Sequence, residues 1–318
     1  MTPPFELFIA SCKKEGGVYR YGIEEGKMPK QLGFTPMDRP MYMTLSENRL
    51  YVLLRAPFEG SEESGLALCD ITADGQLLPP AAIRSTKGQV ACHLTVKNET
   101  VWAVNYTSGS VIKIPGKTVT HRGRSVNQGR QSAPHPHFVS FTPDGAYLAV
   151  TDLGTDEILL YDADLILQGK VSLPKGAGPR HLAFHEDGKH LFCANELTST
   201  VSLLQYEKGA LTLLSTVSAL PPSFHGESTA AAIRCMGDRL FVSNRGHDSV
   251  SLLHFSNGTL SLQKNLSTYG ASPRDFLICG DLLIAANEAS HSVSLISLET
   301  QELISTVPVP SPLCLVIP

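Results

Sequence analysis

The sequence predicts an all-β protein, a seven-bladed β-propeller with four-stranded antiparallel blades. Three observations carry this prediction. A short apolar strand that ends in a polar residue recurs seven times along the 318 residues. Turns containing Asp and Gly separate the apolar runs within the later copies. The chain also has 26 Gly and 21 Pro, while only 18% of its residues are charged. Few charges and many turn formers favour short strands over long surface helices.

The spacing of the repeat matches a propeller blade. Its polar position falls at residues 11, 55, 105, 152, 195, 244 and 287, so the intervals are 44, 50, 47, 43, 49 and 43 residues. The five later copies are clear, and the copies at 8–11 and 52–55 are weaker. A period of about 40–50 residues built from short strands is typical of propeller blades.

Each repeat is expected to contain a strand a, a hairpin, a strand b, a turn, a strand c and a looser strand d. Pro-Asp-Gly at 143–145 and Glu-Asp-Gly at 186–188 supply the hairpin between strands a and b. Glycine favours this turn because it accepts a positive φ without steric cost. Strand c then begins at Val111, Ile158, Val201, Val250 or Val293.

The two ends of the chain are expected to share one blade. The last apolar run, 312–317, resembles a lone strand a, whereas the chain begins with a strand b at 7–10. Their pairing would remove an open sheet edge. The predicted blades of this single domain, 1–318, are 40–88, 89–133, 134–176, 177–225, 226–269, 270–310, and 311–318 together with 1–39.

Composition argues against several classes of protein. A formal net charge of −4 is too small for binding nucleic acid through overall charge. The seven cysteines are scattered without a Cys-x-x-Cys pair, which favours free thiols in a reducing cytoplasm. Residues 1–10 lack the features of a signal peptide, and no run reaches about 18 apolar residues. We therefore expect a cytoplasmic monomer or weak homodimer with no nucleic-acid partner, no membrane partner, no metal and no other cofactor.

Polar side chains recur where strand a begins and strand b ends. Both points lie at the same rim of a blade's inner edge, where propellers commonly bind ligands. On the strand-a side, these residues are Cys92, His93, His135, His137, Arg180, His181, Arg274 and Asp275. On the strand-b side, they are Asn105, Asp152, Asn195, Glu196, Asn244, Arg245, Asn287 and Glu288.

Several of these segments resemble one known family. Gly-Ala-Gly-Pro-Arg-His-Leu-Ala-Phe-His at 176–185, followed by Asn-Glu-Leu at 195–197, is similar to the seven-bladed propeller lactonases. That family includes bacterial propeller-type 6-phosphogluconolactonases and fungal 3-carboxy-cis,cis-muconate lactonising enzymes. Segments at 136–137, 152–154, 243–250 and 273–276 extend the resemblance over residues 130–295. It implies a lactonase whose small-molecule substrate is a sugar-derived anionic lactone, above all 6-phosphogluconolactone.

The resemblance also implies site residues. Similarity to the muconate lactonising members places His137, Arg180, Glu196 and Arg245 on the family's proposed active-site positions, with Arg274 near the same rim. Lactone opening requires a base for water and positive charge for the oxyanion. Glu196 or His137 would take the proton, and we prefer Glu196 because a neighbouring arginine would keep it ionised.

The arginines would hold a carboxylate or phosphate through paired hydrogen bonds. The full set of predicted substrate-binding residues is Arg180, Arg245, Arg274, His181, Asp152 and Asn195.

Structural alternatives exist for these residues. Arg180 and Glu196 would also serve as an ion pair between strands a and b. His137 would also serve as a buried hydrogen-bonding histidine. The repeated Asn more often bonds within its own turn than binds a ligand. His-Pro-His at 135–137 has the spacing of two metal ligands, but no third ligand is evident.

Two other functions stay open, a non-catalytic propeller that binds a ligand or protein and a muconate-type lactonising cycloisomerase. A metal-dependent lactonase of the six-bladed kind is disfavoured by the seven repeats. The chain has no Gly-x-Ser-x-Gly elbow, which argues against a serine hydrolase. If Glu196 is the base, Glu196→Gln should fold normally and lose about 100-fold or more in rate.

Overall fold

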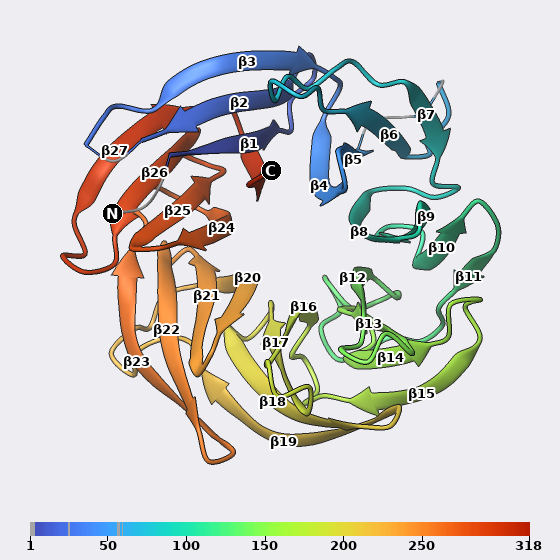
Figure 1. Cartoon of the computed structure of the whole chain (residues 1–318). Coiled ribbons are helices and arrows are strands. Elements are labelled where there is room, and N and C mark those ends of the chain that lie inside the picture. The colour runs from blue at the N-terminus through green and yellow to red at the C-terminus, as the bar shows by residue number, and fades with distance from the viewer. Residues whose placement is uncertain (1–3, 25, 56–57, 59) are drawn as a thin grey trace. The chain divides into compact units, whose positions relative to one another are not determined.

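The computed structural model describes residues 4–24, 26–55, 58 and 60–318. Over these residues the chain contains 28 strands and no α-helix, and the strands form seven four-stranded sheets (Figure 1). The prediction of an all-β fold with seven four-stranded antiparallel blades is confirmed. Residues 1–3, which belong to the expected seventh blade and to the stretch 1–10 that lacks the features of a signal peptide, lie outside the described residues.

The chain divides into two compact units, Met1–Cys92 with Ser267–Pro318 and His93–Leu266. Each unit contains whole or nearly whole sheets. That residues 1–318 form a single domain stays a prediction.

The first unit holds three sheets. One sheet has the order β28 (Pro312–Val316), β1 (Phe5–Ser11), β2 (Gly17–Ile23), β3 (Lys30–Pro36). A second has the order β4 (Pro40–Ser46), β5 (Arg49–Leu54), β6 (Gly65–Asp70), β7 (Ala82–Ser85). The third has the order β24 (Pro273–Cys279), β25 (Leu282–Asn287), β26 (Ser292–Ser297), β27 (Leu303–Pro308).

The terminal strands pair as expected. β28 lies antiparallel to β1, with Phe8 opposite Val316 and Ala10 opposite Cys314. The sheet therefore takes its edge strand β28 from the C-terminus and its other three strands from the N-terminus. This pairing gives β1 a hydrogen-bonded neighbour on each side, because β2 lies along its other edge.

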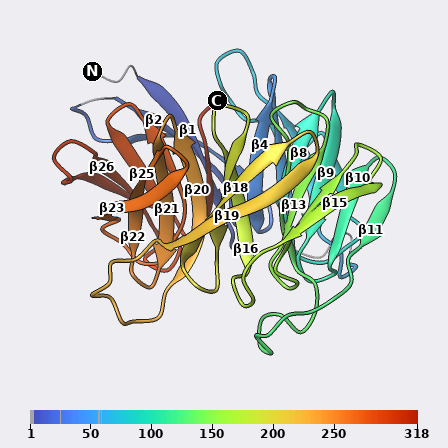
Figure 2. The same ribbon diagram turned by 90° about the horizontal axis from the view of Figure 1, so that it is seen from below.

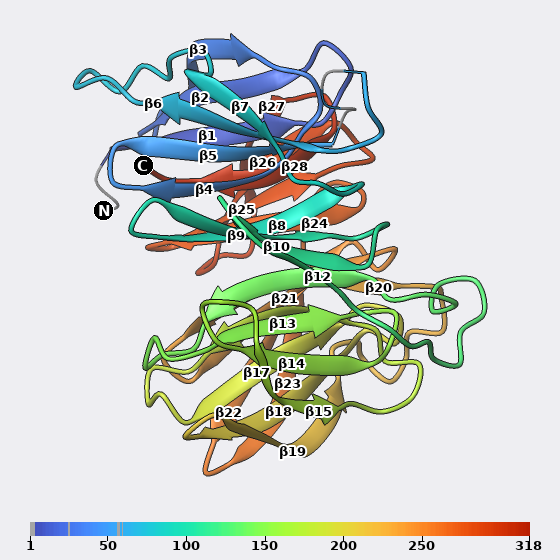
Figure 3. The same ribbon diagram turned by 90° about the vertical axis from the view of Figure 1, so that its right-hand side faces the viewer.

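The second unit holds the other four sheets. One sheet has the order β8 (Ala91–Lys97), β9 (Thr100–Asn105), β10 (Ser110–Ile114), β11 (Thr118–Thr120), and the next has the order β12 (Pro136–Phe141), β13 (Leu148–Asp152), β14 (Glu157–Tyr161), β15 (Leu167–Ser172). A third has the order β16 (Pro179–Phe184), β17 (His190–Asn195), β18 (Thr200–Glu207), β19 (Ala210–Ser218). The fourth has the order β20 (Thr229–Met236), β21 (Arg239–Arg245), β22 (Ser249–Ser256), β23 (Thr259–Ser267). Figure 2 shows the long β18–β19 pair, and Figure 3 shows β12 to β15 in succession.

The core lies between neighbouring sheets of each unit. In the second unit, Phe192 and Val201 of one sheet share a buried cluster with Leu240 and Leu253 of the next. The middle strands are buried on both faces, which explains why they are short continuous apolar runs in the sequence. Each fully buried Leu or Phe side chain contributes about 1.5–3 kcal/mol relative to an exposed one.

The repeated Asn links strands b and c of its own sheet. Nδ2 of Asn195 donates to Oγ of Ser202 (2.9 Å), Nδ2 of Asn244 to Oγ of Ser251 (2.7 Å). Nδ2 of Asn287 donates in the same way to Ser294 (3.0 Å). The partner is therefore a hydroxyl seven residues further along the chain, on the next strand, in addition to turn contacts of the kind the sequence suggests.

A bulge recurs at the start of strand a and places the predicted site residues. In β16, Pro179 pairs with Asn195 and His181 with Ala194, so that Arg180 has no partner in the ladder. His137 of β12 and Arg274 of β24 occupy the same position, each directly after a proline. A bulge turns the extra residue out of the regular alternation and re-aims its side chain.

Candidate active site

Glu196 is the centre of the candidate site. It directly follows β17, and its backbone N–H donates to the carbonyl of Gly178, at 2.7 Å. The side chain is almost completely buried, with 4% of its surface exposed. A buried carboxylate of this kind requires partners that compensate for lost hydration.

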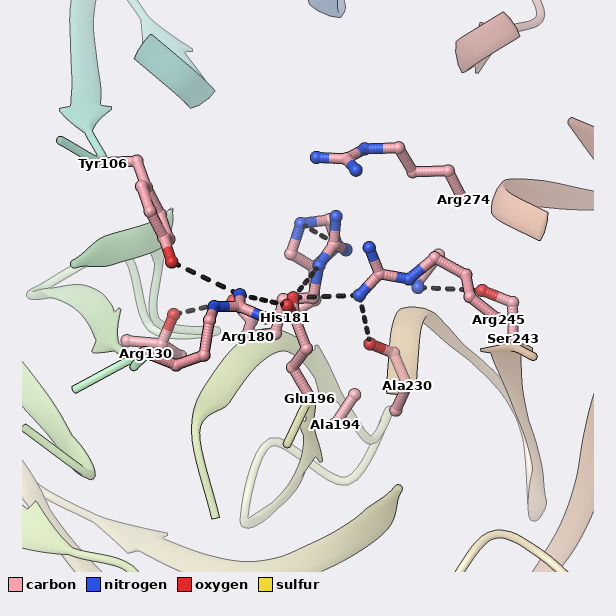
Figure 4. Close-up of polar contacts among 12 residues, drawn as sticks. Tyr106, Arg130, Arg180, His181, Ala194, Glu196, Ala230, Ser243, Arg245 and Arg274 are labelled. Atoms are coloured by element: carbon pink, nitrogen blue, oxygen red, sulfur yellow. Dashed lines mark hydrogen bonds and ion pairs between the residues drawn. The ribbon is translucent and has the colours of Figure 1, made fainter. Parts of the chain in front are cut away.

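Three arginines surround the Glu196 carboxylate (Figure 4). Nη2 of Arg130 lies 2.6 Å from Oε1, while Nε of Arg180 lies 2.9 Å and Nη2 of Arg245 lies 3.1 Å from Oε2. All four residues belong to the second unit. The structure therefore brings together three of the residues predicted from the sequence, Arg180, Glu196 and Arg245.

The charge of this cluster is positive. Three guanidinium groups against one carboxylate leave two positive charges in excess. Burial alone would raise the pKa of the Glu196 carboxyl, but Arg245 and Arg180, followed by His137 and Arg130, outweigh burial and hold that pKa far below its usual range. Glu196 is therefore ionised at neutral pH, and the excess charge is available to an anionic ligand.

Three buried histidines lie beside the arginines. The ring centroid of His181 is 5.2 Å from that of His93 and 5.3 Å from that of His137. Burial, followed by the charge of nearby arginines, lowers the pKa of both His93 and His181 well below the usual value. The neutral His181 ring accepts a hydrogen bond from Nη1 of Arg180 through Nε2, at 3.2 Å. In this structure His181 therefore contacts the site through Arg180, whose side chain it helps to position.

His137 is within reach of the same cluster. It is buried, its ring meets the Tyr106 ring edge-on with centroids 5.7 Å apart, and its charge when protonated favours ionised Glu196. The structure thus places His137 against His181 and within electrostatic range of Glu196. The division of acid and base roles between these two residues stays a prediction.

Arg130 and Tyr106 were not predicted from the sequence. Nη2 of Arg130 also donates to the Tyr106 hydroxyl at 3.3 Å, and the Tyr106 ring stacks on His135 with centroids 4.3 Å apart. Tyr106 follows the repeated Asn105 as Glu196 follows Asn195, so the repeat itself contained a signal for it. Arg130 lies in the connection between β11 and β12, outside the repeat pattern, and no sequence signal marked it.

Asp152 holds the segment that carries Arg130. Its Oδ2 accepts a hydrogen bond from Nδ1 of His121 (2.7 Å), and its Oδ1 accepts one from the His135 backbone N–H (2.8 Å). Oδ1 also accepts from the N–H groups of Gly154 and Thr155. Asp152 is fully buried, so this geometry supports a structural role. Its predicted role in substrate binding stays a prediction.

The remaining predicted residues lie apart from these contacts. Asn195 is fully buried, and its Nδ2 donates to Thr200 and Ser202, which supports the structural alternative for it. Arg274 belongs to the first unit, where its Nη1 lies 3.4 Å from Oε2 of Glu288. That Arg274 shares a rim with Glu196 stays a prediction.

A cavity of about 500 Å³ lies along β11, β14 and β15 of the second unit. Its lining includes His121, Tyr161, Arg122 and Lys170, and it shares no residue with the Glu196 cluster. Oη of Tyr161 lies 3.0 Å from Nε2 of His121, and burial raises the pKa of Tyr161 to about 12. This cavity is therefore separate from the Glu196 cluster, although charged residues line it as well.

The described ranges contain neither a metal-ligand group nor a membrane-spanning helix. No group of three or more His, Cys, Asp or Glu is placed there to hold a metal ion. None of those residues forms a helix with the length and apolar character needed to cross a bilayer.

The comparisons with known proteins agree with the fold. The family model described as "Lactonase, 7-bladed beta-propeller" matches residues 6–317, which confirms the predicted seven-bladed β-propeller. An uncharacterized protein of Staphylococcus aureus is 32% identical over 308 residues, covering 88% of each chain.

Solved structures give the same result. A Lactobacillus plantarum protein superposes with a TM-score of 0.88 at 28% identity and covers 100% of both chains. A candidate 6-phosphogluconolactonase of Bacteroides fragilis superposes with a TM-score of 0.88 at 25% identity, covering 99% of this chain and 98% of its own. The chain therefore belongs to the seven-bladed β-propeller lactonase family.

Proposed function

We propose that this lactonase hydrolyses a sugar-derived anionic lactone and that its substrate is 6-phosphogluconolactone. One observation carries the proposal, the buried Glu196 carboxylate ringed by Arg130, Arg180 and Arg245. The excess positive charge suits a phosphate or carboxylate, because guanidinium groups bind both through paired charge-assisted hydrogen bonds. Similarity to the candidate 6-phosphogluconolactonase of Bacteroides fragilis supports the choice of lactone.

The reaction uses one water molecule. Glu196 takes a proton as the water oxygen attacks the lactone carbonyl carbon, and the carbonyl electron pair moves onto its oxygen. An arginine of the cluster stabilises that oxyanion. When the tetrahedral intermediate collapses, the ring C–O bond breaks, and the leaving ring oxygen receives the proton that Glu196 took, which restores the carboxylate. The product is the open hydroxy acid, and His137 is the alternative proton carrier.

The same ion pairs favour a second candidate function, binding of an anion without catalysis. A carboxylate that contacts three guanidinium groups is a weak base, because each contact stabilises its ionised form. A binding propeller would need the arginines but no proton transfer. The predicted cytoplasmic location, the absence of a cofactor and the monomeric or weakly dimeric state stay predictions.

Hydrolysis of freshly prepared 6-phosphogluconolactone tests the proposal, with spontaneous hydrolysis subtracted. The wild type should show a clear rate. Arg180→Ala should lose about 100-fold or more in rate, because it removes one of the guanidinium groups proposed to stabilise negative charge on the substrate. Arg124→Gln removes an exposed arginine and is the matched control. No wild-type rate above background would refute hydrolysis of this lactone, and tight binding of 6-phosphogluconate in that case would support the binding function.

A further inference from the structure

Arg130 differs from the other two arginines of the Glu196 cluster. Its side chain is 42% exposed, whereas the side chains of Arg180 and Arg245 are 3% and 15% exposed. Arg180 and Arg245 project from strands β16 and β21, while Arg130 projects from the connection between β11 and β12. Arg130 is therefore the member of the cluster that both reaches solvent and contacts the buried carboxylate.

The contacts of Arg130 cover one particular atom. Nη2 of Arg130 lies on Oε1 of Glu196 at 2.6 Å, while Arg180 and Arg245 both contact Oε2. A general base must present an oxygen lone pair to the proton that it takes, at hydrogen-bonding distance. With Arg130 in this position, Oε1 is occupied by a donor, and Oε2 is held by two more.

We propose that Arg130 recognises the anionic group of the substrate and moves from Oε1 of Glu196 to that group when the substrate binds. The move uncovers Oε1 for proton transfer, so that recognition of the anion and exposure of the base become one event. This inference rests on the proposed lactonase function and makes Arg130 the residue that distinguishes anionic from neutral lactones.

The exchange is physically accessible. It replaces one charge-assisted ion pair by another, and a half-exposed arginine is partly screened by water in both positions. Arg180 and Arg245 remain on Oε2, so Glu196 stays ionised after Arg130 departs. The groups that face Glu196 are Arg130, Arg180, Arg245 and His137. Only the first of these has to move.

The backbone of the Arg130 segment is anchored, so a side-chain movement is sufficient. Nε2 of Gln131 donates to the Asp156 carboxylate at 2.7 Å and to the Leu153 carbonyl at 2.8 Å. Ser125 donates to Asp156 as well, from the other side of Arg130 in the sequence. Gln131 is fully buried directly beside Arg130. The side chain of Arg130 can therefore rotate between two acceptors from a fixed point.

Binding and kinetics with Arg130→Gln test the inference. Calorimetric titration with 6-phosphogluconate, the stable ring-opened product, needs no turnover. Arg130→Gln should raise its Kd about 10- to 100-fold, as expected for the loss of a charge-assisted contact. Arg130→Lys should restore part of the affinity, and Arg124→Gln of the same connection should leave it unchanged.

Two lactones separate recognition from base exposure. For 6-phosphogluconolactone, Arg130→Gln should raise KM at least tenfold. For neutral glucono-δ-lactone, which has no anionic group to draw Arg130 away, the same variant should raise kcat/KM several-fold because Oε1 is already uncovered. The acidic limb of the pH profile for the neutral lactone should also move to higher pH in the variant, since one cation no longer favours ionised Glu196.

Several results would overturn the inference. An unchanged Kd for 6-phosphogluconate in Arg130→Gln would do so, and so would equal losses of kcat/KM for the two lactones. If Arg130→Gln fails to fold, Arg130→Ala, which also removes the cation from this partly exposed position, must still show the opposed effects on the two lactones. Wild type that binds 6-phosphogluconate through Arg130 without hydrolysing either lactone would refute the lactonase function and the base-exposure step, while retaining anion recognition. If the wild type hydrolyses 6-phosphogluconolactone and Arg130→Gln behaves identically, the proposed role of Arg130 is refuted while the lactonase function stands.

Discussion

Nδ1 of His121 donates to the carboxylate of Asp152 at 2.7 Å, and the same carboxylate accepts the backbone N–H of His135. Asp152 therefore holds both ends of the 15-residue connection 121–135, which carries Arg130 at the Glu196 cluster. The hydrogen bonds link residues up to 31 positions apart in the sequence. A residue at the end of β13 thus determines where an arginine of the candidate site lies.

Asp152→Asn should loosen this connection. An amide NH₂ group cannot accept from Nδ1–H of His121, so one end of the connection loses its bond. We expect trypsin to cleave after Arg122, Arg124 or Arg130 at least tenfold faster than in wild type, with a fall in lactonase rate. Asp164→Asn removes an exposed ion pair with Lys113 and serves as the control. Equal cleavage of Asp152→Asn and wild type would show that the connection is held by other contacts.

Glu196→Gln should lose stability as well as activity. The sequence alone suggested normal folding, but the structure places the almost fully buried Arg180 against this carboxylate. Breaking a buried ion pair by removing one partner costs about 3–5 kcal/mol of unfolding free energy. Urea unfolding at pH 7 measures this loss. Glu157→Gln, which removes a more exposed pair with Lys170, should cost at most about 1 kcal/mol.

The sign of the pH dependence follows from the lowered pKa. In the folded protein Glu196 stays ionised to lower pH than in the unfolded chain, where its pKa is about 4.3. Its stabilising contribution is therefore complete above about pH 4.3 and is lost as the pH falls towards the folded-state pKa. Glu196→Gln should approach wild-type stability only under those acidic conditions, and a constant difference at all pH values would contradict the ion-pair account.

The buried histidines should make the protein less stable in mild acid. His93 and His181 have lowered pKa values when folded, so below about pH 6.5 the unfolded chain binds protons that the folded chain does not. Each group then lowers the unfolding free energy by up to about 1.4 kcal/mol per pH unit. Urea midpoints between pH 7.5 and 5.5 should fall less steeply for His181→Gln than for wild type. Parallel curves for the two proteins would exclude His181 as a source of the effect.

Gly178→Ala tests the backbone that positions Arg180 and Glu196. Gly178 has a φ of +67°, and a Cβ there would lie 2.5 Å from Cγ of Leu197, the residue after Glu196. The substitution should cost about 1–3 kcal/mol from backbone strain, with a further loss from the clash, and should lower the lactonase rate. Gly188→Ala has the same backbone strain at φ +66° but meets its nearest neighbour, Pro143, only at 3.8 Å. Equal thermal stability of the two variants would mean that the Leu197 contact relaxes freely.

The repeat in the sequence was enough to predict the sheets and part of the site. Strand content, blade number and the union of β28 with β1 depend on short apolar runs and turns, which are local patterns. The positions after each strand-a proline and after each repeated Asn also recur, which is why Arg180, Glu196 and Arg245 could be predicted from the sequence. Tyr106 follows the same rule and was overlooked.

Only the tertiary structure revealed the places of Arg130 and Asp152. Arg130 meets Glu196 across 66 residues, from a connection with no counterpart in the repeat. Asp152 occupies a repeat position that looks like a ligand site, yet its carboxylate is taken up by the ends of that connection. Sequence periodicity records how each strand is buried within its own blade. The contacts between charged side chains such as Arg130 and Glu196 are decided by the tertiary structure. The connection that carries Arg130 has no repeating sequence pattern, and its position depends on the distant residues that hold its two ends.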